Sequence, residues 1–188
     1  MGYSDRRASR HAMVFGGVIL TALFALSEAR AAGAYAGIGF ARLSSEDLDT
    51  DNLGLVVGNS RDRGPGLEFF YAPTYSKDNF SVDPFDVEVT IDAYGLLAYY
   101  KTASDDFNGY LKLKAGIARV DLEFDFGDIG SIDDHTSGLA YGISLGTQIG
   151  NGALEFTYLL LPEFDDFQGI EVDAEVDMMG IFYQWNIN

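Results

Sequence analysis

An acidic segment near the start of the chain has the spacing of a calcium-binding loop. Three aspartates alternate there as the first ligands of an EF-hand do: Asp47, Asp49 and Asp51. The segment then departs from that motif, because Asn52 stands where the sharp turn needs glycine and Gly58 where the bidentate glutamate belongs. We therefore exclude an EF-hand. Looser binding of divalent cations by these aspartates or by Asp133 and Asp134 is the remaining metal-site hypothesis, against the alternative of solvated loops.

A second candidate site is a histidine and a serine two residues apart, His135 and Ser137. In an extended strand both side chains lie on the same face, where the imidazole can activate the hydroxyl as a nucleophile. The pair resembles the His-x-Ser motif of the lipid A deacylase barrels, and this resemblance implies hydrolysis of an acylated lipid. That family has its orienting glutamate in the stretch that corresponds to 144–150, which contains no acid here. We predict two polar residues at a loop–strand junction and no catalytic site.

Eight segments of the chain alternate in the way that strands do. They are 34–43, 53–59, 66–75, 87–101, 109–124, 137–149, 153–161 and 170–187. The alternation is clearest in 137–149, where large apolar residues take one parity: Leu139, Tyr141, Ile143, Leu145 and Ile149. Near the end of the chain the apolar parity is rich in aromatics, with Tyr183 and Trp185. This pattern is typical of strands with one face in lipid and the other toward a polar lumen.

The connections between these segments alternate in length. Those after the second, fourth and sixth segments are short: 60–65, 102–108 and 150–152. In the last of them, Asn151 and Gly152 suit a tight hairpin. The other four are longer and rich in acids: 44–52, 76–86, 127–136 and 162–169. Outer-membrane barrels have short periplasmic turns and longer outer loops in this way.

The start of the chain has the features of an export signal. A basic stretch with Arg6, Arg7 and Arg10 precedes the uncharged apolar run 13–26, and a small-x-small cleavage pattern follows at 29–31. The apolar run is shorter than the about 20 residues that a spanning helix needs. We predict a cleaved signal peptide over 1–31 and a single barrel domain over 32–188.

The charge and composition of the chain restrict its partners and its stabilising bonds. Without residues 1–31 the 12 basic and 29 acidic residues become 8 and 27, a net charge of −19. Such a charge argues against nucleic acid or an anionic surface as a partner, since binding to phosphates needs a basic footprint. The chain has no cysteine, which excludes disulfides and thiolate metal sites. We expect no cofactor.

Several of these segments resemble those of a known protein family. The run 134–149, the segments 94–97 and 109–120, and the Tyr183-Gln184-Trp185 end resemble strands of the small OmpA-like outer-membrane β-barrel domains. The resemblance implies an all-β fold, an eight-stranded antiparallel transmembrane barrel with up-and-down meander topology. It also implies that the barrel-assembly machinery reads the last strand, and it places the protein in the outer membrane of a Gram-negative-type bacterium.

The interior of such a barrel is just wide enough for side chains to fill it. Charged residues on the parity that faces it include Glu68, Lys112, Lys114 and Glu155. Gln148 and Gln184 share that parity. We expect the opposite charges to pair as a plug, because an unpaired buried charge is costly.

The sequence thus predicts a monomeric, non-enzymatic barrel with a structural or surface-interaction role. Its expected partners are outer-membrane lipid and lipopolysaccharide, with divalent cations at the acidic loops. The alternative is a small porin-like channel for a solute, and a lipid A-modifying hydrolase is a third hypothesis.

Overall fold

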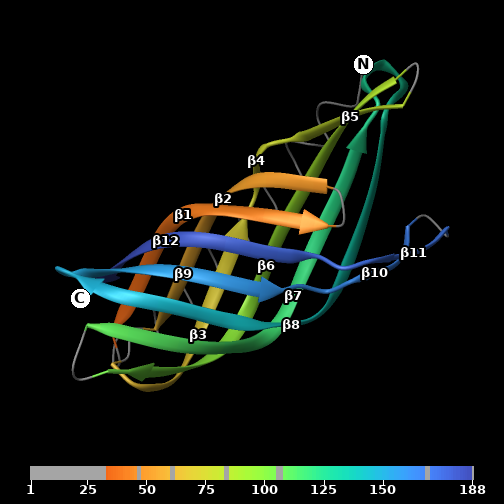
Figure 1. Ribbon diagram of the computed structural model, residues 1–188. Helices are drawn as coiled ribbons and strands as arrows, with labels where there is room; N and C mark the ends of the chain where they lie inside the picture. The colour runs from red at the N-terminus through yellow and green to blue at the C-terminus, as the bar shows by residue number, and fades with distance from the viewer. Residues whose placement is uncertain are drawn as a thin grey trace.

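The computed structural model describes residues 33–45, 48–59, 62–82, 85–104, 108–167 and 170–187 (Figure 1). The predicted signal peptide therefore lies outside the described residues. Most of the described chain is β-strand, and its helical content is the short 3₁₀ helix η1 (Gly127–Ile129). Within these ranges no helix is long and apolar enough to cross a membrane.

Eight strands of the described chain form a closed antiparallel barrel. They are β1 (Ala34–Ser45), β2 (Leu48–Asn59), β3 (Gly64–Ala72), β6 (Phe85–Ala103), β7 (Gly109–Asp125), β8 (Ser131–Ile149), β9 (Gly152–Leu160) and β12 (Asp177–Ile187). Each pairs with the next, and β12 pairs back with β1 from Ala34–Ile187 to Ser44–Asp177, which closes the sheet. Figure 1 shows this seam, with β1 in orange beside β12 in blue. The predicted fold class is confirmed.

The alternation of residue types decides which face each side chain takes. On β8, Leu139 and Ile143 point outward and are 76% and 45% exposed, whereas Ala140 and Ser144 point inward and are buried. The other strands repeat the pattern and give the barrel an outer apolar belt that includes Phe40, Leu67, Leu96, Ile117, Phe156 and Ile181. A transmembrane barrel presents such a belt to lipid.

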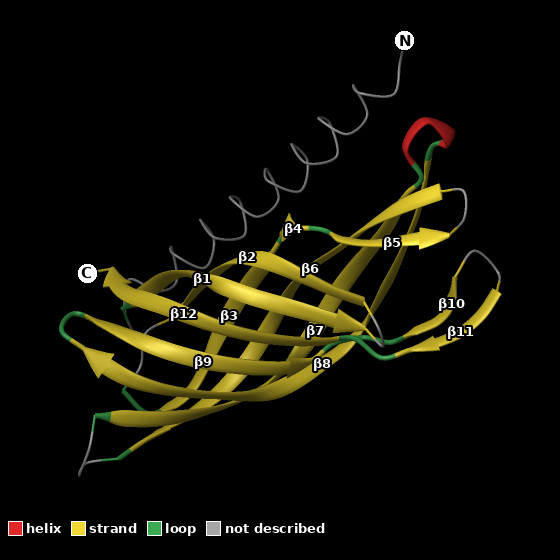
Figure 2. Ribbon diagram, turned by 45° about the horizontal axis from the view of Figure 1, so that its top comes forward, coloured by secondary structure: helices red, strands yellow, loops and turns green. Residues whose placement is uncertain are grey.

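The two ends of the barrel differ. At the end that we name the turn end, the connections 60–63, 104–108 and 150–151 are short, as the sequence predicts. At the other, the extended end, β6, β7 and β8 run on past their neighbours and reach 19, 17 and 19 residues (Figure 2). There β5 (Asp78–Val82) pairs with β6, while β10 (Phe164–Phe167) and β11 (Ile170–Ala174) pair only with each other.

The extension corrects two of the predicted loops, because much of 76–86 and 127–136 is strand. β8 begins at Ser131, which pairs with Asp125 of β7. Among the acids that suggested loops, Asp86 and Asp133 take the outer face of these strands, Asp134 shares the inner face with its partner Leu122, and Asp128 lies in η1. Most inward side chains of the extension are apolar and buried, among them Val87, Val89, Ile91 and Val120. The alternation of inward and outward side chains therefore continues through these acidic segments, and it supports strand pairing there.

Three further strand limits differ from the prediction. β2 begins at Leu48 instead of Leu53 and pairs with β1 along that whole length. The third strand ends at Ala72, because Pro73 has no N–H to donate to a ladder, and the chain then forms β4 (Thr74–Ser76) beside β2. The predicted last strand, 170–187, is divided into β11 and β12.

The β8–β9 hairpin turns one residue earlier than expected. Ile149 pairs with Gly152, so the two turn residues are Gly150 and Asn151. Gly150 has a φ of 60°, a left-handed conformation that glycine adopts without steric cost. Gly152 instead begins β9.

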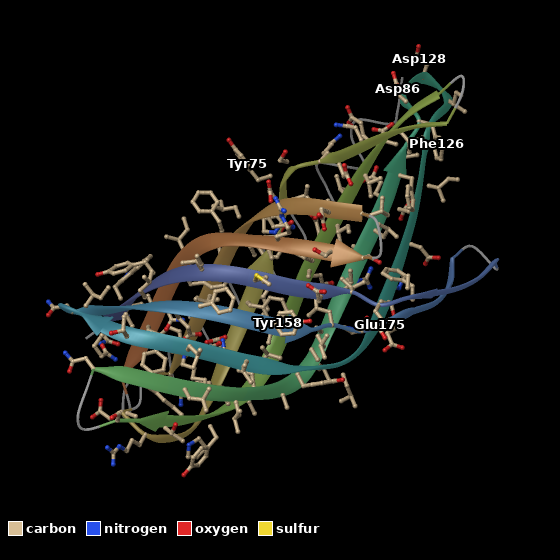
Figure 3. The ribbon with its side chains drawn as sticks, viewed as in Figure 1. Tyr75, Asp86, Phe126, Asp128, Tyr158 and Glu175 are labelled. Atoms are coloured by element: carbon tan, nitrogen blue, oxygen red, sulfur yellow. The ribbon has the colours of Figure 1, made fainter. Side chains whose placement is uncertain are left out.

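The interior has two layers. Toward the extended end, buried side chains form an apolar layer that includes Leu43, Val56, Phe70, Ile91, Leu97, Val120, Leu159, Met178 and Phe182. Toward the turn end, the inward side chains are mostly polar and form the polar layer described below. Figure 3 draws the side chains of the described residues, with Asp86, Phe126 and Asp128 at the tip of the extension and Tyr158 on the barrel wall.

Candidate functional site

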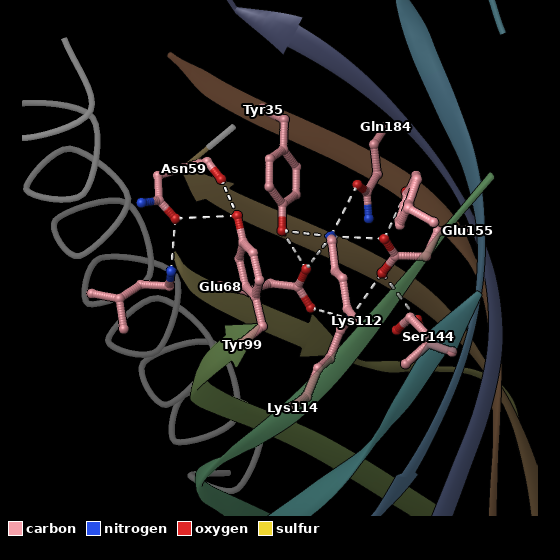
Figure 4. Close-up of polar contacts among 12 residues, drawn as sticks. Tyr35, Asn59, Glu68, Tyr99, Lys112, Lys114, Ser144, Glu155 and Gln184 are labelled. Atoms are coloured by element: carbon pink, nitrogen blue, oxygen red, sulfur yellow. Dashed lines mark hydrogen bonds and ion pairs between the residues drawn. The ribbon is translucent and has the colours of Figure 1, made fainter. Parts of the chain in front are cut away.

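The four inward charges predicted from the sequence meet inside the barrel (Figure 4). Glu68 comes from β3, Lys112 and Lys114 from β7, and Glu155 from β9. Lys112 Nζ lies 3.2 Å from Glu68 Oε2 and 2.7 Å from Glu155 Oε2. Lys114 Nζ lies 2.5 Å from Glu68 Oε1 and 2.9 Å from Glu155 Oε1. Each lysine thus contacts both glutamates, and all four side chains are almost fully buried.

Hydrogen bonds surround this cluster of charges. Tyr35 donates its hydroxyl to Glu68, and Tyr110 donates to Glu155 Oε2 at 2.8 Å. Thr157 donates to Glu155 Oε1 at 3.3 Å and is itself joined to Ser144 at 2.8 Å. The carboxylates therefore keep several charge-assisted hydrogen bonds, which offset much of the cost of removing them from water.

Three tyrosine rings enclose the Lys112 ammonium. Its Nζ lies 4.6 Å from the ring centroid of Tyr35, 4.9 Å from that of Tyr99 and 5.7 Å from that of Tyr110. These distances are within the range of cation–π attraction. Sequence reasoning missed the tyrosines, because aromatic residues of a barrel are expected first at the membrane interfaces.

Inward glycines on the neighbouring strands nevertheless indicate where these tyrosines lie. A Cβ on Gly58 would lie 2.6 Å from Tyr35 Cζ, one on Gly66 2.2 Å from Tyr99 Cζ, and one on Gly146 2.1 Å from Tyr110 Cζ. Each inward tyrosine therefore lies over a glycine of a neighbouring strand. Inward glycines in a small barrel mark the places where large side chains cross the lumen.

We expect Gly146→Ala to destabilise the barrel by about 1–3 kcal/mol, because the new methyl group displaces the Tyr110 ring that holds Glu155. Gly138→Ala is the matched control. Gly138 lies on the same strand and face, and a Cβ there would meet Pro162 Cβ at an ordinary 3.4 Å. Urea unfolding of both refolded variants in lipid measures the difference. Equal losses would contradict this account of tyrosine packing.

The candidate catalytic residues lie elsewhere, on the outer face of the extension. His135 and Ser137 are exposed, and no hydrogen bond joins their side chains in the described part of the chain. In the register of the two strands His135 lies opposite Asp121 of β7. The sequence alone did not predict this neighbour. The carboxylate of Asp121 lies 2.7 Å from Arg119 Nε, so its position is set by that arginine.

Of the candidate metal ligands, Asp49 and Asp51 contact an arginine. Arg42 donates to Asp51 Oδ1 at 3.0 Å and lies 4.0 Å from Asp49. Asp47 lies outside the described residues. Asp133 and Asp134 are consecutive in β8, so their side chains take opposite faces and do not converge. No group of three acidic or histidine side chains within the described ranges is arranged to hold a metal ion.

This chain is similar to known proteins in its fold. No protein-family model matches the sequence, and no curated protein is similar enough to count as a match. The fold is similar to that of Ail, the attachment invasion locus protein of Yersinia pestis, solved with the heparin analogue sucrose octasulfate. The TM-score is 0.56 at 16% identity, over 82% of this chain and 97% of that one.

Two further structures are similar. Neisserial surface protein A gives a TM-score of 0.58 at 13% identity, over 82% of this chain and 96% of that one. The N-terminal β-barrel domain of Pseudomonas aeruginosa OprF gives 0.51 at 13% identity, over 80% and 97%. Identities this low establish the fold alone. This chain has the fold of the small eight-stranded outer-membrane β-barrels, which is the fold that its resemblance to the OmpA-like family implied.

Proposed function

We propose that this protein is an integral outer-membrane β-barrel with a structural or surface-interaction role and without enzymatic activity. The observation that carries the proposal is the filled interior. The polar layer near the turn end is held by four ion pairs, and the apolar layer lies beyond it. A solute would have to displace both layers to pass.

The outer apolar belt supports a membrane position with the extended end outside. On β7 the outward residues Leu113 and Ile117 are exposed and apolar, and the next two outward residues are Arg119 and Asp121. A strand needs about 9–11 residues to cross a bilayer. The 17 residues of β7 therefore leave a charged segment beyond it. The export signal expected in 1–31 agrees with this position.

The outer face of the extension supports a surface role. Neighbouring strands place acids side by side there: Asp92 of β6 pairs with Asp121 of β7, and Glu123 of β7 with Asp133 of β8. Like charges in directly opposite positions repel one another. Arg119 offsets part of this repulsion at Asp121. Divalent cations that bridge lipopolysaccharide phosphates would offset the negative charge of the face as a whole, so we propose the outer leaflet and its cations as the partners of this face.

Two observations disfavour the other hypotheses. A porin-like channel needs a continuous polar path, and the apolar layer interrupts it with Phe70 and Phe182, each 1% exposed. A lipid A-modifying hydrolase needs a serine in reach of a base, and His135 and Ser137 have no hydrogen bond between them. We therefore favour the non-enzymatic barrel.

Planar-bilayer recording tests the proposal. We expect refolded protein at neutral pH to give no single-channel steps, while a known porin in the same bilayer conducts. Discrete steps whose size follows the salt concentration would favour the channel instead. Incubation with lipid A and analysis of released fatty acid tests the hydrolase, and release that is lost in Ser137→Ala would overturn the non-enzymatic assignment.

A further inference from the structure

The polar layer contains a third lysine that forms no ion pair with the two glutamates. Lys101 of β6 is 9% exposed, faces inward and is paired directly with Lys112 of β7. Both carboxylates of the layer are shared between Lys112 and Lys114. Among the described residues, no carboxylate lies within ion-pair distance of Lys101, whose Nζ instead lies 4.1 Å from the Tyr110 ring centroid. The layer thus holds three positive charges and two negative ones.

A buried amide group nearby has a donor to spare. Gln184 of β12 is 5% exposed, and its Oε1 accepts a hydrogen bond from Lys112 Nζ at 3.5 Å. Its Nε2 has no hydrogen-bond partner within the described structure. A buried donor without an acceptor costs about 1–3 kcal/mol. A negatively charged hydrogen-bond acceptor would therefore satisfy both the Lys101 ammonium and the Gln184 Nε2 donor.

A small cavity connects these groups at the turn end. Its volume is about 20 Å³, and its lining includes Lys101, Lys112, Gln184 and the tyrosines Tyr35, Tyr99 and Tyr110. No acidic residue of the described chain lines it. A site of this size accommodates one species about as large as a water molecule, since such a molecule needs at least about 10–15 Å³.

We propose that this cavity binds one small monovalent anion of halide size, such as chloride. The Lys101 ammonium supplies the charge, and the Gln184 amide supplies a hydrogen bond. The anion balances the third lysine of the layer, so that every buried charge has a partner. The site lies on the far side of the ionic cluster from the extended end and is separate from the acidic surface proposed to meet lipopolysaccharide.

Chloride binding can be measured on the refolded protein in a non-ionic detergent. The buffer holds ionic strength constant with sodium gluconate, whose anion is too large for the cavity, and chloride replaces gluconate in steps. We expect a saturable rise in Tm, because a ligand that binds the folded state stabilises it. We also expect broadening of the ³⁵Cl resonance by the protein, which bromide reverses by competition.

Two substitutions and one control make the test specific. Lys101→Gln should abolish both the Tm rise and the ³⁵Cl broadening, and Gln184→Leu should raise the chloride midpoint about tenfold, as the loss of one hydrogen bond to an ion does. Lys77→Gln removes a lysine that pairs with Glu88 on the exposed extension, and it should keep the wild-type response.

A wild-type protein with no chloride response would overturn the proposal and leave water as the occupant. An equal response in Lys101→Gln would overturn it as well, by placing the chloride elsewhere. If Lys101→Gln does not fold, the Gln184→Leu midpoint decides: an unchanged midpoint contradicts the site. None of these outcomes depends on whether the barrel conducts or meets lipopolysaccharide.

Discussion

Lys112→Met is expected to destabilise the refolded barrel by about 3–5 kcal/mol, the cost of breaking a buried ion pair by removing one partner. Lys112 contacts both Glu68 and Glu155, so its loss leaves two carboxylates with one lysine between them. Glu155 is fully buried, so water does not replace the ion pair that it loses. Urea unfolding in lipid measures the change.

A double-mutant cycle separates the ionic interaction from packing. Lys112→Met combined with Glu155→Gln should cost less than the sum of the two single changes, because the second change removes the charge that the first left unpaired. The exposed pair Lys77–Glu88 is the matched control, and its cycle should give about 1 kcal/mol or less. Additive losses for Lys112 with Glu155, and again for Lys112 with Glu68, would refute a coupled cluster.

Ile143→Arg is expected to cost about 2–4 kcal/mol, the range for a cation placed on the lipid face near the bilayer midplane. Ile143 lies in the outer apolar belt and is 45% exposed without lipid. His135→Arg is the control, because His135 is on the same strand and face but beyond the belt. It should change stability by less than about 0.5 kcal/mol. Refolding yield and unfolding in lipid compare the two, and equal losses would show that the belt is misplaced.

The confirmed prediction of the fold class depends on a period of two. Alternation in 137–149 and 109–124 assigns the inner and outer faces of those strands, and it assigns Lys112 and Lys114 to one face. A strand offers only two faces, so parity alone sorts the side chains. Which inward residues meet depends on register between strands, which the sequence does not state.

The predictions that failed depend on composition. The acids of 127–136 suggested a loop, although Ser131 and the residues after it continue β8. The inner apolar layer with Phe70 and Phe182 was not predicted, because only the charged and amide residues of the inward parity were considered. Lys101 shares the parity of the predicted cluster, but its lack of a partner follows only from the distances in the folded chain.

The seam between β1 and β12 has a consequence for how the barrel forms. Ala34 pairs with Ile187, so the contacts that close the barrel join residues from opposite ends of the described chain. Such distant contacts raise contact order and slow folding. Until the seam closes, β1 and β12 each leave an open edge whose backbone groups can pair with another chain. We therefore expect closure to be a late step of folding, and we expect a chain whose seam is still open to be the species most prone to aggregate.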